Sequence, residues 1–272
     1  MEIIKYPRTY HIEGSRFQHG DEDLNNVPFS QIKGKFLVIE EKIDGANAGI
    51  SFTEDGELLL QSRGHYLTGG FREKHFDLLK TWANTFAYQI FEAIGDRYIL
   101  YGEWLYAKHT VFYTDLPHYF LEFDMLNKST KTFLSTAERK KILAKMPFMQ
   151  SVKVIFEGKL EQAKQLQDMI RQSHFICENH LEVLKKLADK LNLNAERVLN
   201  ETNLSSLMEG LYIKWEEEGI VKGRYKFVRP DFLNSILDSE THWLDRLIVP
   251  NQLAKGVDLF NYELEIRNEL QK

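Results

Sequence analysis

The chain has 272 residues, of which 43% are hydrophobic and 28% are charged, and its formal net charge is −5 at pH 7. These values are typical of a globular protein that can bury a full core, as one large domain or as one domain with an appendage. The negative net charge argues against a protein that coats nucleic acid indiscriminately, so any nucleic-acid contact has to be local.

The sequence shows no sign of membrane insertion or secretion. No apolar run reaches the roughly 18 residues that a membrane helix needs, and the N-terminus lacks the regions of a signal peptide. Cys177 is the single cysteine, which excludes an intramolecular disulfide and a cysteine-rich zinc site. We therefore expect a cytoplasmic protein.

The first 35 residues are rich in turn signals and include a segment, 6–16, in which aromatic and basic residues interleave. This pattern suits a surface that holds phosphates and stacks bases. It suits an N-terminal packing arm equally well, and the sequence leaves both interpretations open.

Two apolar, strand-like runs at 36–39 and 50–52 flank the tetrapeptide Lys42-Ile43-Asp44-Gly45. The lysine is thus placed where a strand ends and a turn begins. Such a position suits a nucleophile, because an amine attacks only when unprotonated, and partial burial or neighbouring positive charge favours that form. Gly45 and Gly49 would let the backbone approach a nucleotide closely. The alternative is a hairpin turn with a surface Lys-Asp pair.

A second strand and a long helix are predicted next. Residues 58–63 have the pattern of a strand that ends at Arg63, followed by a loop with three glycines at 64–70. From about 72 to 94, apolar residues recur at three- and four-residue intervals and stop at Gly95. This spacing predicts one amphipathic helix that serves as scaffold.

Two further strands carry residues of chemical interest. The strand predicted over 98–106 is apolar except for Glu103, and an unpartnered carboxylate in a core is costly enough to require a metal, a cation or a hydroxyl nearby. The strand predicted over 119–126 contains Phe120 and Phe123. Aromatic residues on strands belong more often to a core than to a base-stacking site.

The last third of the chain begins with helices and continues with a hairpin. Residues 157–200 predict two or three helices with charged outer faces, either a packing elaboration or an RNA contact. Two strands at 208–214 and 220–229 flank an acidic turn, and Arg224 and Lys226 alternate so that both point to one face. A final helical stretch is predicted from Pro230 through Phe232, Ile236 and Leu237.

The segment Glu41-Lys42-Ile43-Asp44-Gly45-Ala46-Asn47 resembles motif I of the covalent nucleotidyltransferases, the superfamily of ATP-dependent RNA and DNA ligases and mRNA capping enzymes. It looks most like the RNA ligase 2 branch. Later segments resemble the other motifs in family order, over residues 36–229: Ser62-Arg63, Gly102-Glu103, Phe123-Asp124, Glu209-Gly210 with Lys214, and Arg224-Tyr225-Lys226. The family more often has Lys-x-Lys in the last motif, and the link before it is shorter here than usual.

The resemblance implies an α+β nucleotidyltransferase (ATP-grasp-like ligase) fold with two mainly antiparallel sheets and peripheral helices. It implies a nucleotidyltransferase domain over 1–229, with a helical insertion at about 157–200, and a small C-terminal helical appendage over 230–272. An OB domain needs more than about 50 residues. Since 43 residues follow Arg229, no OB domain is expected.

The implied activity is that of an ATP-dependent RNA ligase that joins RNA 5′-phosphate and 3′-hydroxyl ends, with ATP as substrate and Mg²⁺ or Mn²⁺ as cofactor. Lys42 would carry the AMP covalently. The alternatives are a DNA or polynucleotide ligase, a capping-type guanylyltransferase, or a non-catalytic RNA-binding relic.

The resemblance also implies roles for individual residues. Lys42, Arg63, Arg224 and Lys226 would be catalytic, and Glu103 and Glu209 would orient the metal ion or bind ribose hydroxyls. Phe123 would stack on the base, with Phe120 as the competing choice. Arg63, Lys214, Arg224 and Lys226 would hold phosphates. The nucleotide site would comprise Glu41, Ile43, Asp44, Asn47, Arg63, Glu103, Phe123, Glu209, Lys214, Arg224 and Lys226.

Overall fold

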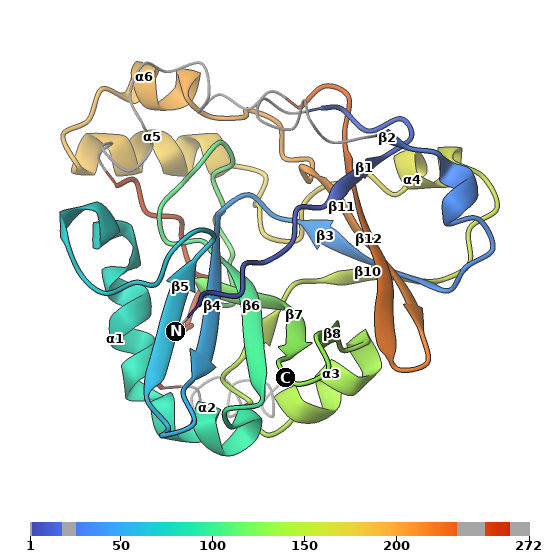
Figure 1. Cartoon of the computed structure of the whole chain (residues 1–272). Helices are drawn as coiled ribbons and strands as arrows, with labels where there is room; N and C mark the ends of the chain where they lie inside the picture. Colours follow the sequence, from blue (N-terminus) through green and yellow to red (C-terminus); the bar gives the residue numbers. More distant parts are fainter. Residues whose placement is uncertain (1, 18–25, 233–247, 262–272) are drawn as a thin grey trace.

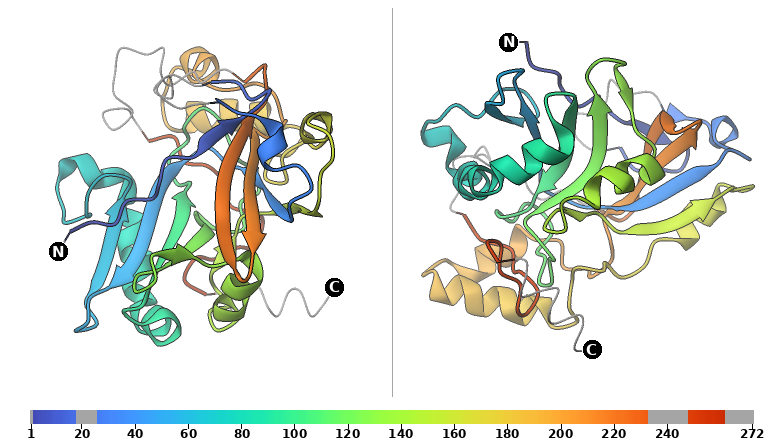
Figure 2. Two further views of the ribbon diagram at one scale, coloured as in Figure 1. Left: turned by 45° about the vertical axis from the view of Figure 1, so that its right-hand side comes forward. Right: turned by 90° about the horizontal axis from the view of Figure 1, so that it is seen from below.

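The computed structural model describes residues 2–17, 26–232 and 248–261. Its strands form two sheets that face one another (Figures 1 and 2). The first sheet has the order β10-β3-β11-β12-β1-β2 and comprises Val154–Gly158, Leu37–Lys42, Gly210–Glu217, Ile220–Val228, Tyr10–Ile12 and Asn26–Val27. The second has the order β5-β4-β6-β7-β8, with β9 beside β7, and comprises Leu58–Ser62, Ala46–Phe52, Tyr98–Trp104, Phe120–Asn127, Thr132–Phe133 and Gln150–Ser151.

Both sheets are mainly antiparallel. The parallel pairs are β1 with β12, β1 with β2, and β7 with β9. The expected fold class, two mainly antiparallel sheets with helices outside them, is confirmed.

The strands on either side of Lys42–Gly45 belong to different sheets. β3 pairs with β10 and β11 in the first sheet, whereas β4 pairs with β5 and β6 in the second. The alternative of a hairpin turn is therefore wrong. Because β3 has a neighbour on each edge and is buried along its length, its apolar run is continuous. The chain crosses between the sheets at the tetrapeptide itself.

The prediction of one continuous helix over 72–94 is wrong, because three helical elements occupy this region. A 3₁₀ helix, η2 (Phe71–Phe76), precedes α1 (Asp77–Thr85), and α2 (Ala87–Ile94) follows after a break at Phe86. The buried Phe86 ring stacks on Phe148 at 4.5 Å, and its backbone leaves the helical region at φ −103°, ψ 11°. Gly95 ends α2 at φ 55°, as its position predicted. Both helices lie on the outer side of the second sheet (Figure 1).

The helices predicted within 157–200 are present. α4 (Lys164–Asp168) packs on the outer face of the first sheet through the fully buried Leu166. Two others, α5 (His180–Lys190) and α6 (Ala195–Asn200), form a separate apolar cluster with Phe112 at one end of the molecule (Figure 1). The remaining helices are η1 (Phe29–Gln31) and α3 (Thr136–Leu143).

The β11–β12 hairpin turns at Glu218 and Gly219, whose φ values of 53° and 78° match the two positive φ positions of a tight hairpin turn. After β12 the helix predicted from Pro230 is not found at Phe232, while Ile236 and Leu237 lie outside the described residues. Residues 248–261 contain no helix. Among the described residues, none of the helices has the length and apolar character needed to span a bilayer.

Candidate active site

A cavity of about 650 Å³ opens between the two sheets. It is lined by residues from the ends of β3, β6, β7, β11 and β12 and by the N-terminal segment. Ten of the residues predicted for the site line it: Glu41, Lys42, Ile43, Asp44, Asn47, Arg63, Glu103, Phe123, Glu209 and Lys226. The sequence therefore identified most of this cavity before its shape was known.

Lys42 ends β3, and the pairing of Lys42 with Gly210 brings Glu209 beside it. The Lys42 Nζ donates a hydrogen bond to Glu209 Oε1 at 2.7 Å. Burial by itself lowers the pKa of the Lys42 amine, but the carboxylates of Glu209, Asp44 and Glu103 outweigh it and raise the pKa above its ordinary value. Without a bound nucleotide, the acids around Lys42 therefore favour its ammonium form.

Asp44 anchors the crossing between the sheets to the loop that follows β6. Its Oδ2 accepts hydrogen bonds from the backbone N–H groups of Thr110 and Val111 at 2.7 and 2.9 Å. Its own N–H donates to the Tyr113 hydroxyl at 2.7 Å. The Asp44 carboxylate therefore holds the turn that follows Lys42 against this loop.

The two glycines have a different use from the one expected. A Cβ on Gly45 would lie 2.7 Å from Leu105 Cδ2 and 2.8 Å from the Trp104 carbonyl oxygen. One on Gly49 would lie 2.8 Å from the side chain of Gln61. Each glycine thus permits close approach to a neighbouring strand or loop, although Gly45 also lines the cavity.

Glu103 and Asn47 face each other across β6 and β4, and both line the cavity. Burial raises the pKa of Glu103 to about 8, so the carboxyl group takes up a proton near neutral pH. Asn47 Oδ1 is buried and accepts no hydrogen bond from any described residue. These oxygen donors, with Glu209, have the hard ligand chemistry that Mg²⁺ and Mn²⁺ prefer.

Within residues 2–17, 26–232 and 248–261, no group of three His, Cys, Asp or Glu side chains has the arrangement of a metal site. Any ion held by Glu103 would have to displace its proton.

Phe123 owes its direction to a β-bulge. The register of β6 and β7 skips it, because Gly102 pairs with Glu122 while the neighbouring Tyr101 pairs with Asp124. A bulge of this kind bends the strand and re-aims a side chain. As a result Glu122, Phe123 and Asp124 all contact groups on the side of the first sheet.

The two phenylalanines of β7 differ in their position relative to the cavity. Phe123 lines the cavity, with its ring centroid 5.1 Å from that of Tyr6 and 5.9 Å from that of Tyr212. Phe120 is fully buried in the core, stacked on Trp82 at 6.0 Å. The base-stacking role predicted for this strand can therefore belong only to Phe123.

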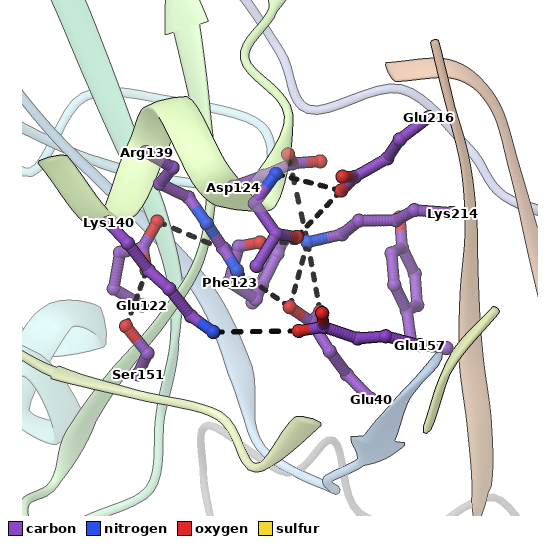
Figure 3. A network of polar contacts seen from close by, with 12 residues as sticks. Glu40, Glu122, Phe123, Asp124, Arg139, Lys140, Ser151, Glu157, Lys214 and Glu216 are labelled. Atoms are coloured by element: carbon purple, nitrogen blue, oxygen red, sulfur yellow. Dashed lines mark hydrogen bonds and ion pairs between the residues drawn. The ribbon is translucent and has the colours of Figure 1, made fainter. Parts of the chain in front are cut away.

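Lys214 does not line the cavity. Its ammonium group lies 2.9 Å from Glu40 Oε2 and 3.8 Å from Asp124 Oδ1, and it donates to the backbone carbonyl of Phe123 (Figure 3). The prediction that Lys214 holds a phosphate is therefore wrong, because its ammonium group pairs with the buried carboxylates of Glu40 and Asp124. β11 does aim Lys214 at the second sheet, where its ammonium group meets the backbone of β7 at Phe123.

Arg224 is also held away from the cavity. Its Nε donates to Asp124 Oδ2 at 2.8 Å, and its guanidinium lies 3.6 Å from the ring centroid of Phe133. Lys226, two residues further along β12, does line the cavity. The predicted alternation is right, but it brings one of the two cations to the site.

These contacts belong to a buried network that joins the sheets and consists of three carboxylates and three cations: Glu40, Glu122, Asp124, Arg139, Lys214 and Arg224. All of its members except Arg224 are labelled in Figure 3. Arg139 from α3, 1% exposed, donates to Glu40 Oε1 at 2.7 Å and to Glu122 Oε1 at 3.2 Å. Glu40 and Phe123 also line the cavity, so the network supports two of its walls.

Several lining residues were missed. The N-terminal segment crosses from the second sheet to the first (Figure 1), and Tyr6 is buried within it as a packing residue. Pro7, Arg8 and Thr9 of the same segment line the cavity. The segment therefore packs against the core and also faces the cavity, and its role in holding phosphates or bases stays a prediction. His109, on a loop with no periodicity, gave no signal of its position at the cavity.

A second cavity of about 910 Å³ continues from the first. The two share five lining residues: Gly45, Asn47, Arg63, Glu103 and His109. The glycine loop after β5 and Phe71 form part of its wall, and Phe71 is 78% exposed with the Lys74 ammonium 5.0 Å from its ring centroid. An exposed aromatic ring and a cation at a cavity wall suit contact with a base and a phosphate.

The family model for RNA ligases matches residues 35–228. Among solved structures, the chain is similar to three variants of Naegleria gruberi RNA ligase, each with ATP and Mn: two with a lysine replaced by alanine and one with a glutamate replaced by alanine. Identity is 15%, 15% and 16%, and the TM-score is 0.50 for each.

The similarity covers 74% of this chain and 51%, 52% and 52% of those chains, so the chain spans about half their length. At this identity the likeness shows a shared fold. No curated protein matches the chain.

Proposed function

Because the chain belongs to the RNA ligase family, whose model matches residues 35–228, we propose that it is an ATP-dependent RNA ligase that joins 5′-phosphate and 3′-hydroxyl ends. One observation carries the proposal. The Lys42 amine is placed at the crossing between two sheets, in a cavity that is also lined by an aromatic ring, Phe123, and a cation, Lys226.

In the first step the Lys42 Nζ attacks the α-phosphorus of ATP. A nitrogen–phosphorus bond forms and the bond to pyrophosphate breaks. The Lys42 ammonium group gives up two of its three protons to solvent, one before and one after the attack. In the second step an oxygen of the RNA 5′-phosphate displaces Lys42 and takes the AMP. In the third, the 3′-hydroxyl oxygen attacks the 5′-phosphorus, AMP leaves, and the phosphodiester forms. Each step is a displacement at phosphorus, so positioning and electrostatics dominate catalysis.

The chain's own groups have separate tasks in these steps. Phe123 stacks the base, Lys226 and Arg63 face the phosphates, and Glu209 holds the Lys42 side chain until ATP binds. Glu103, Glu209 and the Asn47 oxygen would hold a Mg²⁺ or Mn²⁺ ion, which supplies positive charge against the phosphates. The second cavity, which adjoins Arg63 and His109, supports a place for the RNA end next to the reacting phosphorus.

The test is covalent labelling followed by sealing. We expect label from α-labelled ATP to stay on the denatured protein in the presence of Mg²⁺ or Mn²⁺, and label from GTP not to. Labelling by GTP in place of ATP would instead indicate a capping-type guanylyltransferase. If neither nucleotide labels the protein, the remaining alternative is a non-catalytic RNA-binding protein.

RNA and DNA ligases are separated by four nicked junctions, with RNA or DNA on each side, sealed at equal salt. The 2′-hydroxyl is the group by which a protein tells RNA from DNA. We expect efficient sealing where the 3′-hydroxyl strand ends in ribonucleotides and poor sealing where it ends in deoxyribonucleotides. Equal rates at all four would favour a polynucleotide ligase, and a preference for DNA on both sides would refute the proposal.

Phe123→Ala should weaken ATP use by about 1–3 kcal/mol, the range typical of base–aromatic stacking, because the ring lines the cavity. The measurement is kcat/KM for labelling over a series of ATP concentrations. Phe123→Leu should recover part of the loss. Phe120→Ala is the comparison: it removes a core ring, so it should lower stability while the folded fraction still labels normally. The reverse pattern would assign the base site to Phe120.

Glu209→Gln should move the pH dependence of labelling. The free amine is the nucleophile, so labelling rises with pH, and Glu209 is the first of the carboxylates that raise the pKa of Lys42. Without that charge the pKa falls, and half-maximal labelling should occur at lower pH, even if the maximal rate also drops. Glu217→Gln, at the exposed end of the same strand, should leave the profile in place. An unchanged midpoint in Glu209→Gln would exclude this electrostatic role.

A further inference from the structure

Residues 248–261 lie against the loop that joins β6 to β7, beyond the end of the region that the family model matches. The Lys108 N–H donates to the Val249 carbonyl at 2.7 Å, and the Leu116 N–H donates to the Gln252 carbonyl at 3.1 Å. Leu116 also forms an isolated bridge with Leu253. A distant part of the sequence thus holds the loop along its length.

Asn251 is the centre of this contact. It is fully buried, and both functional groups of its amide are used: Nδ2 donates to the Leu105 carbonyl at 2.7 Å, and Oδ1 accepts from the Tyr113 N–H at 2.9 Å. Its backbone carbonyl accepts from the Tyr119 hydroxyl at 2.8 Å. One side chain therefore ties the start of the loop to its middle.

The same loop holds the residue two positions after Lys42. Thr110 and Val111 donate their N–H groups to Asp44 Oδ2, and Tyr113 accepts the Asp44 N–H on its hydroxyl. Tyr113 is thus bonded to Asn251 through its backbone and to Asp44 through its side chain. The path from Asn251 to the crossing between the sheets consists of hydrogen bonds between buried or half-buried groups.

We propose that Asn251 is a positioning residue, which fixes the β6–β7 loop through Leu105 and Tyr113 and thereby holds Asp44 and the turn that aims Lys42 into the cavity. The sequence motifs give no hint of this, because Asn251 lies outside all of them. The proposal rests on the proposed function for its kinetic test, and an independent structural measurement accompanies that test.

Asn251→Ala should lower the rate of AMP attachment at saturating ATP by about 100-fold, the cost of displacing a reacting group by roughly 1 Å. The KM for ATP should change far less, because Phe123 and Lys226 lie on β7 and β12. The hydrogen bonds of Asn251 go to residues outside these strands: Leu105, Tyr106, Tyr113 and Tyr119. Gln252→Ala is the matched control: its side chain bonds only to the adjacent Pro250 carbonyl among the described contacts, and its labelling should stay normal.

Hydrogen exchange supplies the readout that does not depend on activity. In Asn251→Ala the amides of Thr110 and Val111 should exchange faster, while those of β6 and β7 keep their protection. If the alanine variant does not fold, Asn251→Asp is the second variant. Its side chain has the same shape and keeps the acceptor for the Tyr113 N–H, but it lacks the N–H donor to the Leu105 carbonyl. It should show the same loop-specific change.

Normal labelling and normal Thr110 and Val111 protection in a folded Asn251 variant would overturn the proposal. So would loss of protection in the loop and both strands alike, which would make Asn251 a general stability residue. If the wild-type protein fails to label, the proposed function fails, and the exchange pattern still decides whether Asn251 holds the loop.

Discussion

Lys42→Ala should leave no AMP on the protein, yet the variant should still seal a nicked RNA that already carries a 5′-adenylate. The amine is needed to form and to give up the protein-bound AMP, whereas the last displacement uses the RNA 3′-hydroxyl. The remaining cavity residues are untouched by the substitution, so the pre-adenylated end retains its binding groups. We therefore expect the variant to lose covalent labelling completely and to retain most of its rate of sealing pre-adenylated RNA.

Lys42→Arg is the sharper control, because it keeps the positive charge opposite Glu209. A guanidinium stays protonated at any accessible pH and cannot attack phosphorus, so this variant should label no better than Lys42→Ala. The measurements are label retained on denatured protein and single-turnover sealing of adenylated and non-adenylated nicks. Retained labelling in either variant would place the nucleophile elsewhere, and loss of the final step in both would indicate a damaged site.

The sequence predicted correctly those features that depend on residues close together in the chain. The strand that ends at Lys42, the hairpin after Gly210 and the alternation of Arg224 and Lys226 depend on neighbours in the chain. The sequence could not show that β3 and β4 separate into different sheets, because both runs are compatible with a hairpin. That choice depends on the partners of each strand, β11 and β6, which are far away in sequence.

The positions and partners of the charged side chains could be predicted from the sequence only in part. Lys214 and Arg224 have the spacing of phosphate ligands, but each has a buried anion nearby. Lys214 pairs with Glu40 and Asp124, and Arg224 pairs with Asp124, which follows the bulge at Phe123. A bulge adds one residue to the register and leaves no pattern that period-two reasoning can detect. The network and the positions of His109 and Asn251 are consequences of tertiary packing.

Arg139→Met should destabilise the protein by about 3–5 kcal/mol, the cost typical of breaking a buried ion pair from one side. The substitution keeps an apolar stem of similar length but leaves Glu40 and Glu122, both fully buried, without their guanidinium. The measurement is urea unfolding at pH 7. Lys140→Met, the next residue of α3, is the matched control: its exposed ion pair with Glu157 spans 3.6 Å, so its loss should cost at most about 1 kcal/mol.

The deficit of Arg139→Met should shrink as the pH falls. Burial raises the pKa of Glu122, and Arg139 is the first of the groups that oppose this, so the Glu122 carboxyl group of the variant should titrate above its unfolded value. The folded variant then binds more protons than its unfolded chain, and its stability relative to wild type rises toward low pH. Glu122→Gln in the Arg139→Met background should recover part of the loss at pH 7, because it removes one uncompensated charge. If Arg139→Met stays within about 1 kcal/mol of wild type at pH 7, or if its deficit does not change between pH 7 and pH 5, the network does not join the two sheets energetically.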